Sequence, residues 1–326
     1  MMLEEDDSSR LLRLKADWGG ANLTRAAGWI TQWVWDNTTD HRQAVIYTGR
    51  GMGDNLRALG AGDVDIALAT PASFARLARE GVGPFEGAPI PDLVALGVLP
   101  HRDAMIPVVR KDLGITTLAE LAAHPGPLRI SLGVNDPDGF MGFAADAVLS
   151  AAGVELEDVV ARGGQVTRHE QPFDVIADLH EGRADVMISE AIMTPDWQEL
   201  SRDGSVVLLS LADDEVAALD HRWGLRTIEL PGGYFPHTAD TIRALDYSGW
   251  IVAATSGLPD EFAQLVAQAF SVNSEALARG YRHLPVDYSP LRYPVDLPTA
   301  IATPIPLHPA AEAVYLQKIH GHEELA

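Results

Sequence analysis

Several polar or glycine-rich turns follow short apolar runs, and they carry the side chains that could contact a ligand. They are Asp17-Trp18-Gly19-Gly20, Thr48 to Asn55, Thr70-Pro71-Ala72 and Asn135 to Phe140. In open α/β sheets, ligands bind just beyond the carboxyl ends of the strands, which is where these turns are expected. Gly19-Gly20 permits a tight strand-to-helix turn that presents backbone N–H groups to a polar or anionic ligand. The chemistry of these turns is hydrogen bonding and charge recognition.

Arg50 is the only cationic residue in these turns. Its planar guanidinium suits a carboxylate held by two parallel hydrogen bonds. Asp17 and Asp138 add negative charge, and they could pair with Arg50 or accept hydrogen bonds from ligand hydroxyl or amino groups. A zwitterionic or hydroxylated acid would satisfy both signs better than a plain dicarboxylate.

Other chemistries lack their sequence signatures. Gly49-x-Gly51-x-Gly53 has the wrong spacing for a dinucleotide site, and the acidic residue expected after the next strand is replaced by Thr70. No Ser-His-Asp order, metal-ligand cluster or phosphate loop is visible, and the chain has no cysteine. We therefore expect no catalytic residue, metal or cofactor. His101-Arg102-Asp103 is interpreted as a surface turn.

One local pattern occurs twice. A short helix ends at Gly62, Asp65 follows, and a buried strand then stops at Thr70-Pro71; Gly182, Asp185 and Thr194-Pro195 repeat this order. Both glycines suit the left-handed position that ends a helix. The repeat predicts an α/β protein of two similar lobes with a ligand cleft between them.

The lobes are expected to be interleaved. Lobe 1 would comprise residues 10–105 and 232–326, and lobe 2 residues 107–231. The two crossovers are predicted at Ile106–Arg110 and Thr227–Pro231.

Bulk composition narrows the class of partner. The 326 residues are 47% hydrophobic, which is typical of a globular chain, and the formal net charge is −22. That charge argues against nucleic acid and against anionic membrane surfaces. No apolar run approaches the roughly 20 residues that span a bilayer. The acidic start, Met1 to Ser9, does not resemble a signal peptide, so the chain as written is expected in the cytoplasm, or outside it if a precursor was trimmed.

Several stretches together resemble the TAXI family, the solute-binding receptors of TRAP-type transporters. They include the Gly19-Gly20 turn, Gly51-x-x-x-Asn55-Leu56 before Gly62-x-x-Asp65, Ile130-Ser131-Leu132-Gly133, Pro231-Gly232-Gly233-Tyr234 and Pro306-Leu307-His308-Pro309 with Tyr315. They occur in the family's order over nearly the whole chain.

The resemblance implies a two-lobe, type II periplasmic-binding-protein fold and a small carboxylate-bearing solute, such as an organic or amino acid. It also implies delivery to a TRAP-type membrane permease; we expect a monomer. The ligand-binding residues expected from position and resemblance are Asp17, Trp18, Gly19, Gly20, Asn22, Arg50, Gly51, Met52, Asn55, Thr70, Pro71, Ala72, Asn135, Asp138, Gly139, Phe140 and Glu190.

Two alternatives remain open at this point. One is an enzyme on the same fold that uses Asp17 or Asp138 with Arg50 as an electrophile, since fold does not decide function. The other is a cytoplasmic ligand sensor, which is favoured if the present start is native.

Overall fold

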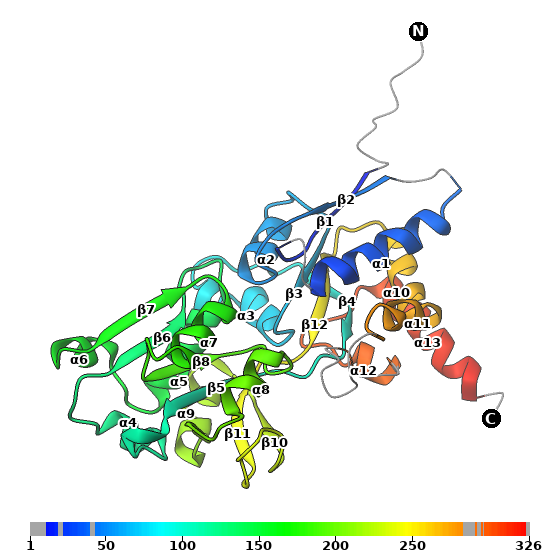
Figure 1. The fold of residues 1–326 in the computed structure, drawn as a ribbon. Coiled ribbons are helices and arrows are strands. Elements are labelled where there is room, and N and C mark those ends of the chain that lie inside the picture. Colours follow the sequence, from blue (N-terminus) through cyan, green and yellow to red (C-terminus); the bar gives the residue numbers. More distant parts are fainter. Residues whose placement is uncertain are drawn as a thin grey trace. The chain divides into compact units, whose positions relative to one another are not determined.

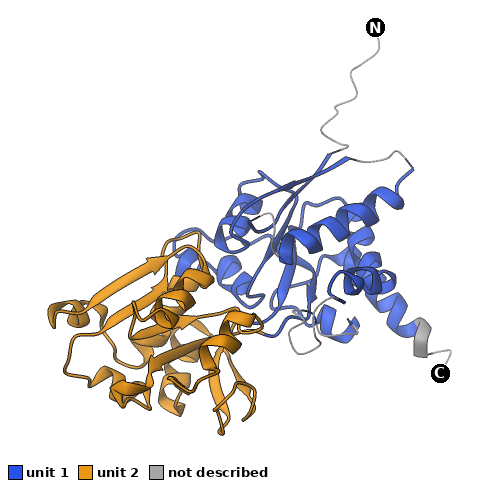
Figure 2. Ribbon diagram, viewed as in Figure 1, with its two compact units in different colours: residues 1–102, 248–326 blue, residues 103–247 orange. Residues whose placement is uncertain are grey.

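The computed structural model describes residues 11–18, 22–39, 43–282, 291, 295 and 297–323. The chain divides into two compact units, Met1–Arg102 with Ser248–Ala326 and Asp103–Tyr247 (Figure 2). Each unit has a mixed sheet with helices packed on it (Figure 1).

Unit 1 contains a sheet that has five strands in the described residues, in the order β2-β1-β3-β12-β4. Its strands are β1 (Leu11–Lys15), β2 (Gln43–Tyr47), β3 (Ile66–Ala69), β4 (Leu93–Leu99) and β12 (Trp250–Thr255). Its helices are α1 (Asn22–Asp36), α2 (Gly53–Gly60), α3 (Phe74–Glu80), η2 (Gly83–Phe85), α10 (Asp260–Val272), α11 (Ser274–Arg279), α12 (Leu297–Ile301) and α13 (Pro309–Glu323). Strands β1, β2 and β3 are parallel to one another, and β12 runs antiparallel to β3 and β4.

Unit 2 has seven strands in its described sheet, in the order β10-β11-β5-β8-β6-β7, with β9 also paired to β5. Its strands are β5 (Ala104–Arg110), β6 (Arg129–Gly133), β7 (Gln165–His169), β8 (Val186–Ser189), β9 (Val206–Leu208), β10 (Thr227–Leu230) and β11 (Ile242–Asp246). Its helices are η3 (Lys111–Leu113), α4 (Leu118–Ala122), α5 (Met141–Ala151), α6 (Leu156–Ala161), α7 (Pro172–His180), α8 (Pro195–Ser201) and α9 (Asp213–Trp223).

The two sheets share one topology. The order β2-β1-β3-β12-β4 in unit 1 corresponds to β7-β6-β8-β5-β9 in unit 2, with the same parallel and antiparallel pairs. In each unit the antiparallel strand, β12 or β5, comes directly after the chain enters from the other unit. The predicted repeat is therefore present in three dimensions, and Gly62 and Gly182 have the predicted left-handed φ of 76° and 74°.

An arginine–aspartate clasp joins the first and third parallel strands of each unit. In unit 1, Asp65 Oδ2 accepts the backbone N–H of Arg13 at 2.7 Å, and the Arg13 guanidinium binds both carboxylate oxygens. In unit 2, Asp185 receives the same three hydrogen bonds from Arg129. Each aspartate also donates its own N–H to the carbonyl of its arginine. The clasp fixes the strand register in both sheets.

Both predicted crossovers are wrong. Ile106–Arg110 lies inside β5, in the middle of the unit 2 sheet, and Thr227–Leu230 forms β10, which pairs with β11. The chain leaves unit 1 after Arg102 and returns at Ser248. The predicted boundary at 231/232 falls inside unit 2, because residues 242–246 form β11 and pair with β5.

Apolar spacing explains how α1 packs in unit 1. Leu23, Ala26, Ala27, Ile30 and Val34 recur every three or four residues, and all are buried. They share one hydrophobic core with alternate residues of the strands and with α10 and α13. Figure 1 shows these three helices side by side.

We predict that removing the aspartates of the clasps costs more than removing the arginines. Asp65→Ala or Asp185→Ala leaves a strand N–H without its acceptor, which costs about 1–3 kcal/mol of unfolding free energy. Arg13→Ala keeps that hydrogen bond and loses a partly exposed ion pair, which costs less than about 1 kcal/mol. Urea unfolding measures both effects, with the exposed Asp63→Ala as the control. Aspartate variants no less stable than this control would contradict the account.

Candidate functional site

Three loops of unit 1 meet at the carboxyl ends of β1, β2 and β3, and Asn55 ties them together. Its amide Nδ2 donates to the carbonyls of Lys15, Ala16 and Leu68 at 3.1, 3.0 and 2.7 Å. The side chain is fully buried. The amide nitrogen of Asn55 therefore holds the ends of β1 and β3 against α2.

The Asp17 carboxylate caps the first turn of α1. It accepts the backbone N–H groups of Leu23 and Thr24 at 2.8 and 2.9 Å and the Thr24 hydroxyl at 2.6 Å. An acidic side chain that accepts from the first turn stabilises a helix N-terminus. The Asp17 carboxylate therefore lies at the N-terminus of α1, where backbone N–H groups were expected to face a ligand.

The loop after β2 is shaped by Gly51 and Asp54. Gly51 has a φ of 74°, and its carbonyl accepts the N–H of Thr70 at 2.9 Å, which joins this loop to the end of β3. The Asp54 carboxylate accepts the N–H groups of Arg50 and Met52. Arg50 is half-buried in this loop.

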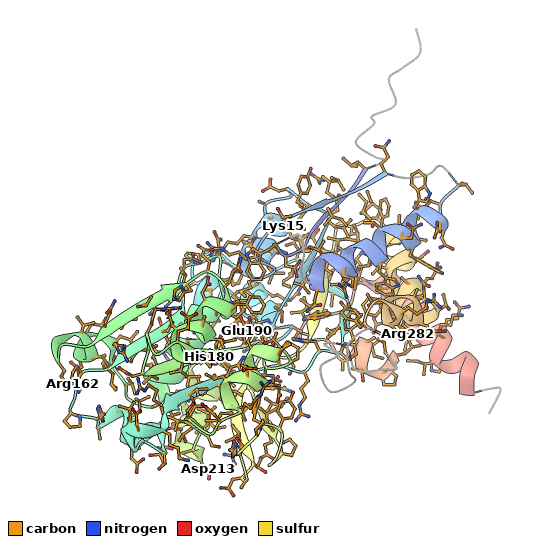
Figure 3. All side chains as sticks on the ribbon, in the orientation of Figure 1. Lys15, Arg162, His180, Glu190, Asp213 and Arg282 are labelled. Atoms are coloured by element: carbon orange, nitrogen blue, oxygen red, sulfur yellow. The ribbon has the colours of Figure 1, made fainter. Side chains whose placement is uncertain are left out.

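Lys15 is a cation at this edge that the sequence analysis did not include. Its ammonium lies 3.1 Å from the Asp54 carboxylate and donates to the Asp54 carbonyl. Figure 3 labels it on β1. Lys15 is the last residue of β1. The alternation of buried and less buried residues along Leu11–Lys15 could have identified it as a polar side chain at the strand end.

Two buried hydroxyls lie at corresponding strand ends. Thr70 Oγ1, just after β3, and Ser189 Oγ, at the end of β8, are buried and have no hydrogen-bond partner among the described residues. A buried polar group without a partner costs about 1–3 kcal/mol, so native structures rarely leave one without a purpose. The Asn55 carbonyl oxygen is a third such atom.

The loop after β6 in unit 2 is organised by an aspartate that was not predicted. Asp136 Oδ1 accepts the N–H groups of Asp138 and Gly139 at 3.0 and 2.8 Å, which turns the chain into α5. Asn135 is exposed and donates to Asp146 at 2.5 Å. Asp138 is exposed, whereas Gly139 and Phe140 are buried.

Glu190 follows β8 and belongs to a buried carboxyl pair. It forms a side-chain hydrogen bond with Asp103, and the two residues are only 8% and 1% exposed. Burial raises the pKa of Asp103 to about 6, against hydrogen bonds that lower it. Burial and the Asp103 charge raise the pKa of Glu190 well above its ordinary value. His101 and Asp103 are buried, so the prediction of a surface turn there is wrong.

The remaining predicted residues fall into three groups. Gly19 and Gly20 lie outside the described residues, as does the predicted start of lobe 1 at Arg10. Trp18 is 37% exposed and Asn22 begins α1. Met52, Pro71 and Ala72 are buried, and the Ala72 N–H donates to the carbonyls of Ser248 and Gly249.

A serine, a histidine and an aspartate also meet in unit 2, but not as a catalytic triad. Asp178 accepts from Ser131 at 2.8 Å and lies 2.6 Å from His169 Nε2, so the carboxylate stands between the two. Burial raises the pKa of Asp178, but hydrogen bonds from Arg183, His169 and Ser131 outweigh it and lower the pKa overall. The cluster ties α7 to β6 and β7.

Two surface pockets lie away from these loops. A pocket of about 550 Å³ in unit 2 is lined by Arg110, Lys111, His180 and neighbours, at the amino end of β8. A smaller pocket in unit 1 is lined by Gly60 and by residues 88–92, which lead into β4. In the residues the structure covers, no group of three or more His, Asp or Glu is arranged to hold a metal. None of the helices described combines the length and apolar character needed to cross a bilayer.

The sequence from residue 27 to residue 318 matches the NMT1-like family. The chain belongs to the NMT1-like family. This NMT1-like sequence matches no curated protein.

Solved structures show the fold of this NMT1-like protein. The Xanthomonas citri protein XAC2383 bound to chloride is 14% identical, with a TM-score of 0.55, and the match covers 97% of this chain and 98% of that one. The same protein bound to ATP gives 12% identity and a TM-score of 0.50 over the same shares. The periplasmic aliphatic sulphonate-binding protein SsuA from Escherichia coli is 17% identical, with 95% and 83% covered and a TM-score of 0.48. The predicted α/β, type II periplasmic-binding-protein fold is confirmed.

We predict that Thr70→Val does not destabilise the solute-free protein, because no hydrogen bond of the Thr70 hydroxyl is lost. Thr38→Val is the matched control, since the buried Thr38 hydroxyl donates to the Val34 carbonyl at 2.9 Å. The control should lose about 1 kcal/mol of unfolding free energy. Urea unfolding compares them, and an equal loss in both variants would show that Thr70 has a partner.

Proposed function

We propose that this NMT1-like protein is a solute-binding protein for a small carboxylate-bearing solute that also carries a hydroxyl or amino group. The solute binds at the carboxyl ends of the parallel strands of both units, and the units close on it. No bond in the solute is made or broken.

The observation that carries the proposal is the pair of buried hydroxyls of Thr70 and Ser189. Each lies at the carboxyl end of the third parallel strand of its unit, and neither has a hydrogen-bond partner among the described residues. A bound solute with oxygen acceptors supplies the missing partners. The two hydroxyls lie one residue apart in the repeat, because Ser189 is equivalent to Ala69, but each marks the same edge of the sheet in its own unit.

Charge at the unit 1 edge supports an acidic solute. Arg50 and Lys15 lie in or beside the loop after β2. Asp54 offsets part of this charge, and Asp17 is engaged with the end of α1. A solute whose carboxylate lies near Arg50 and whose hydroxyl or amino groups lie near the acidic side chains fits this mixture of positive and negative charge.

The TAXI resemblance supports a more specific role. We propose delivery of the solute to a TRAP-type membrane permease, with the protein acting outside the cytoplasm. An enzyme that uses Asp17 as a base is disfavoured, because both carboxylate oxygens of Asp17 are engaged by hydrogen bonds from the start of α1.

We predict that Arg50→Ala weakens solute binding by roughly 2–4 kcal/mol, the usual cost of truncating one partner of a desolvated charge pair. Thermal-shift screening of hydroxy acids, amino acids, dicarboxylates, sulfonates and phosphonates identifies the probe, and calorimetry measures its affinity. Thr70→Val should weaken binding of the same probe.

The exposed Arg162 provides the control for charge, because Arg162→Ala removes one cation far along the chain from every predicted loop. It should bind the probe as the wild type does. Equal affinity of Arg50→Ala and Arg162→Ala would exclude Arg50 from the site, and no shift with any compound would overturn the binding function.

A further inference from the structure

The buried pair of Asp103 and Glu190 lies where the unit 2 segment begins and ends. Asp103 is the first residue of this unit, and Tyr247 is its last. The Tyr247 N–H donates to the Asp103 carbonyl at 3.1 Å, and both side chains are almost wholly buried. Glu190, labelled in Figure 3, follows the end of β8 and forms a side-chain hydrogen bond with Asp103.

Hydrogen bonds show which carboxyl group carries a proton. Asp103 accepts three backbone N–H groups, from Ala104 at 2.8 Å and from Ala191 and Ile192 at 3.1 Å. Three such donors stabilise a carboxylate. Glu190 therefore holds the proton and donates it to Asp103, because two ionised carboxylates in contact would repel each other in a buried site.

The loop after β8 is held by several hydrogen bonds. Ala191 has a φ of 67°, a left-handed conformation that costs a non-glycine residue about 1–2 kcal/mol. Its N–H bonds to Asp103, and its carbonyl accepts from the N–H and hydroxyl of Thr194. The Glu190 carbonyl accepts the indole N–H of Trp197 at 2.7 Å. All of these contacts belong to the loop that the Asp103–Glu190 hydrogen bond joins to the start of β5.

We propose that the Asp103–Glu190 pair is a proton-binding site, and that loss of its proton releases the loop formed by residues 190–194 from Asp103. The site is a pH-sensitive switch within unit 2. It stands on contacts inside this unit, independently of whether the solute proposal holds.

The direction of the pH effect follows from the environment. The titratable groups that face Glu190 are Asp103 at the start of β5 and the Tyr247 phenol after β11. Burial, and then the charges of Glu190 and Asp103, raise the pKa of Tyr247 well above its ordinary value, so the phenol is neutral and adds no charge. Trp197 of α8 contributes an uncharged donor.

For a carboxyl group whose pKa is higher in the folded protein than in the unfolded chain, the stabilising contribution is complete at low pH. It is lost as the pH rises through the folded value. For Glu190, which holds the proton of the pair, this loss comes at a pH well above the ordinary pKa of a glutamate. The loop is therefore held in acid and released in alkali.

Carbon-13 NMR of the full chain labelled at glutamate carboxyls tests the protonation directly. The Glu190 signal, assigned by its loss in Glu190→Gln, should have the protonated shift at pH 6 and should move to the ionised shift by pH 10. An ionised shift at pH 6, or no movement up to pH 10, would overturn the proposal.

Exchange of the Trp197 indole N–H tests the release of the loop, and Trp197→Phe assigns its signal. The ratio of exchange rates between wild type and Glu190→Gln cancels the intrinsic pH dependence. It should be near one at pH 6 and should rise at least threefold as the Glu190 signal titrates. Glu157→Gln, on the exposed start of α6, should behave as the wild type does. A ratio that stays at one through the titration would refute the switch.

Discussion

The arrangement of both units depends on one interaction used twice, the clasp of an arginine in the first parallel strand by an aspartate that precedes the third. Arg13 with Asp65 and Arg129 with Asp185 share the same donors, acceptors and backbone hydrogen bonds. Because the carboxylate replaces a strand carbonyl as the acceptor of the arginine N–H, the two strands are fixed in register where they begin. Their carboxyl ends then meet at one edge of the sheet, and the polar loops gather there.

Part of this could be predicted from the sequence. The glycine that ends a helix, the aspartate and the buried strand are local in the chain, and they identified the repeat and the loops at the strand ends. Arg13 and Arg129 lie 52 and 56 residues from their partners, and no local pattern connects them. The hydrogen bonds from Asn55 to Lys15 and Ala16 also span 40 and 39 residues, whereas Asp17 bonds to Leu23 and Thr24, only 6 and 7 residues further along. Their positions in the sequence correctly predicted that Asp17 and Asn55 lie at strand ends. The hydrogen bonds of Asp17 to α1 and of Asn55 to three backbone carbonyls could be seen only in the structure.

The crossover at Ile106–Arg110 was wrong for an instructive reason. An apolar run interrupted by Pro107 is atypical of a central strand, because proline cannot donate to the ladder. In β5 this proline falls between the residues that pair with β11, Ala104 and Met105, and those that pair with β9, Val108 to Arg110. Its missing N–H therefore interrupts neither pairing. A sequence pattern cannot show that two different strands share one side of a third.

The most direct test of the account is small-angle X-ray scattering with and without the solute that gives the largest thermal shift. The central claim is that two units of common topology bind one solute through the carboxyl ends of their strands and close on it. At saturating solute, the account predicts a smaller radius of gyration than for the solute-free protein. An unchanged radius, with binding confirmed by calorimetry in the same sample, would contradict it.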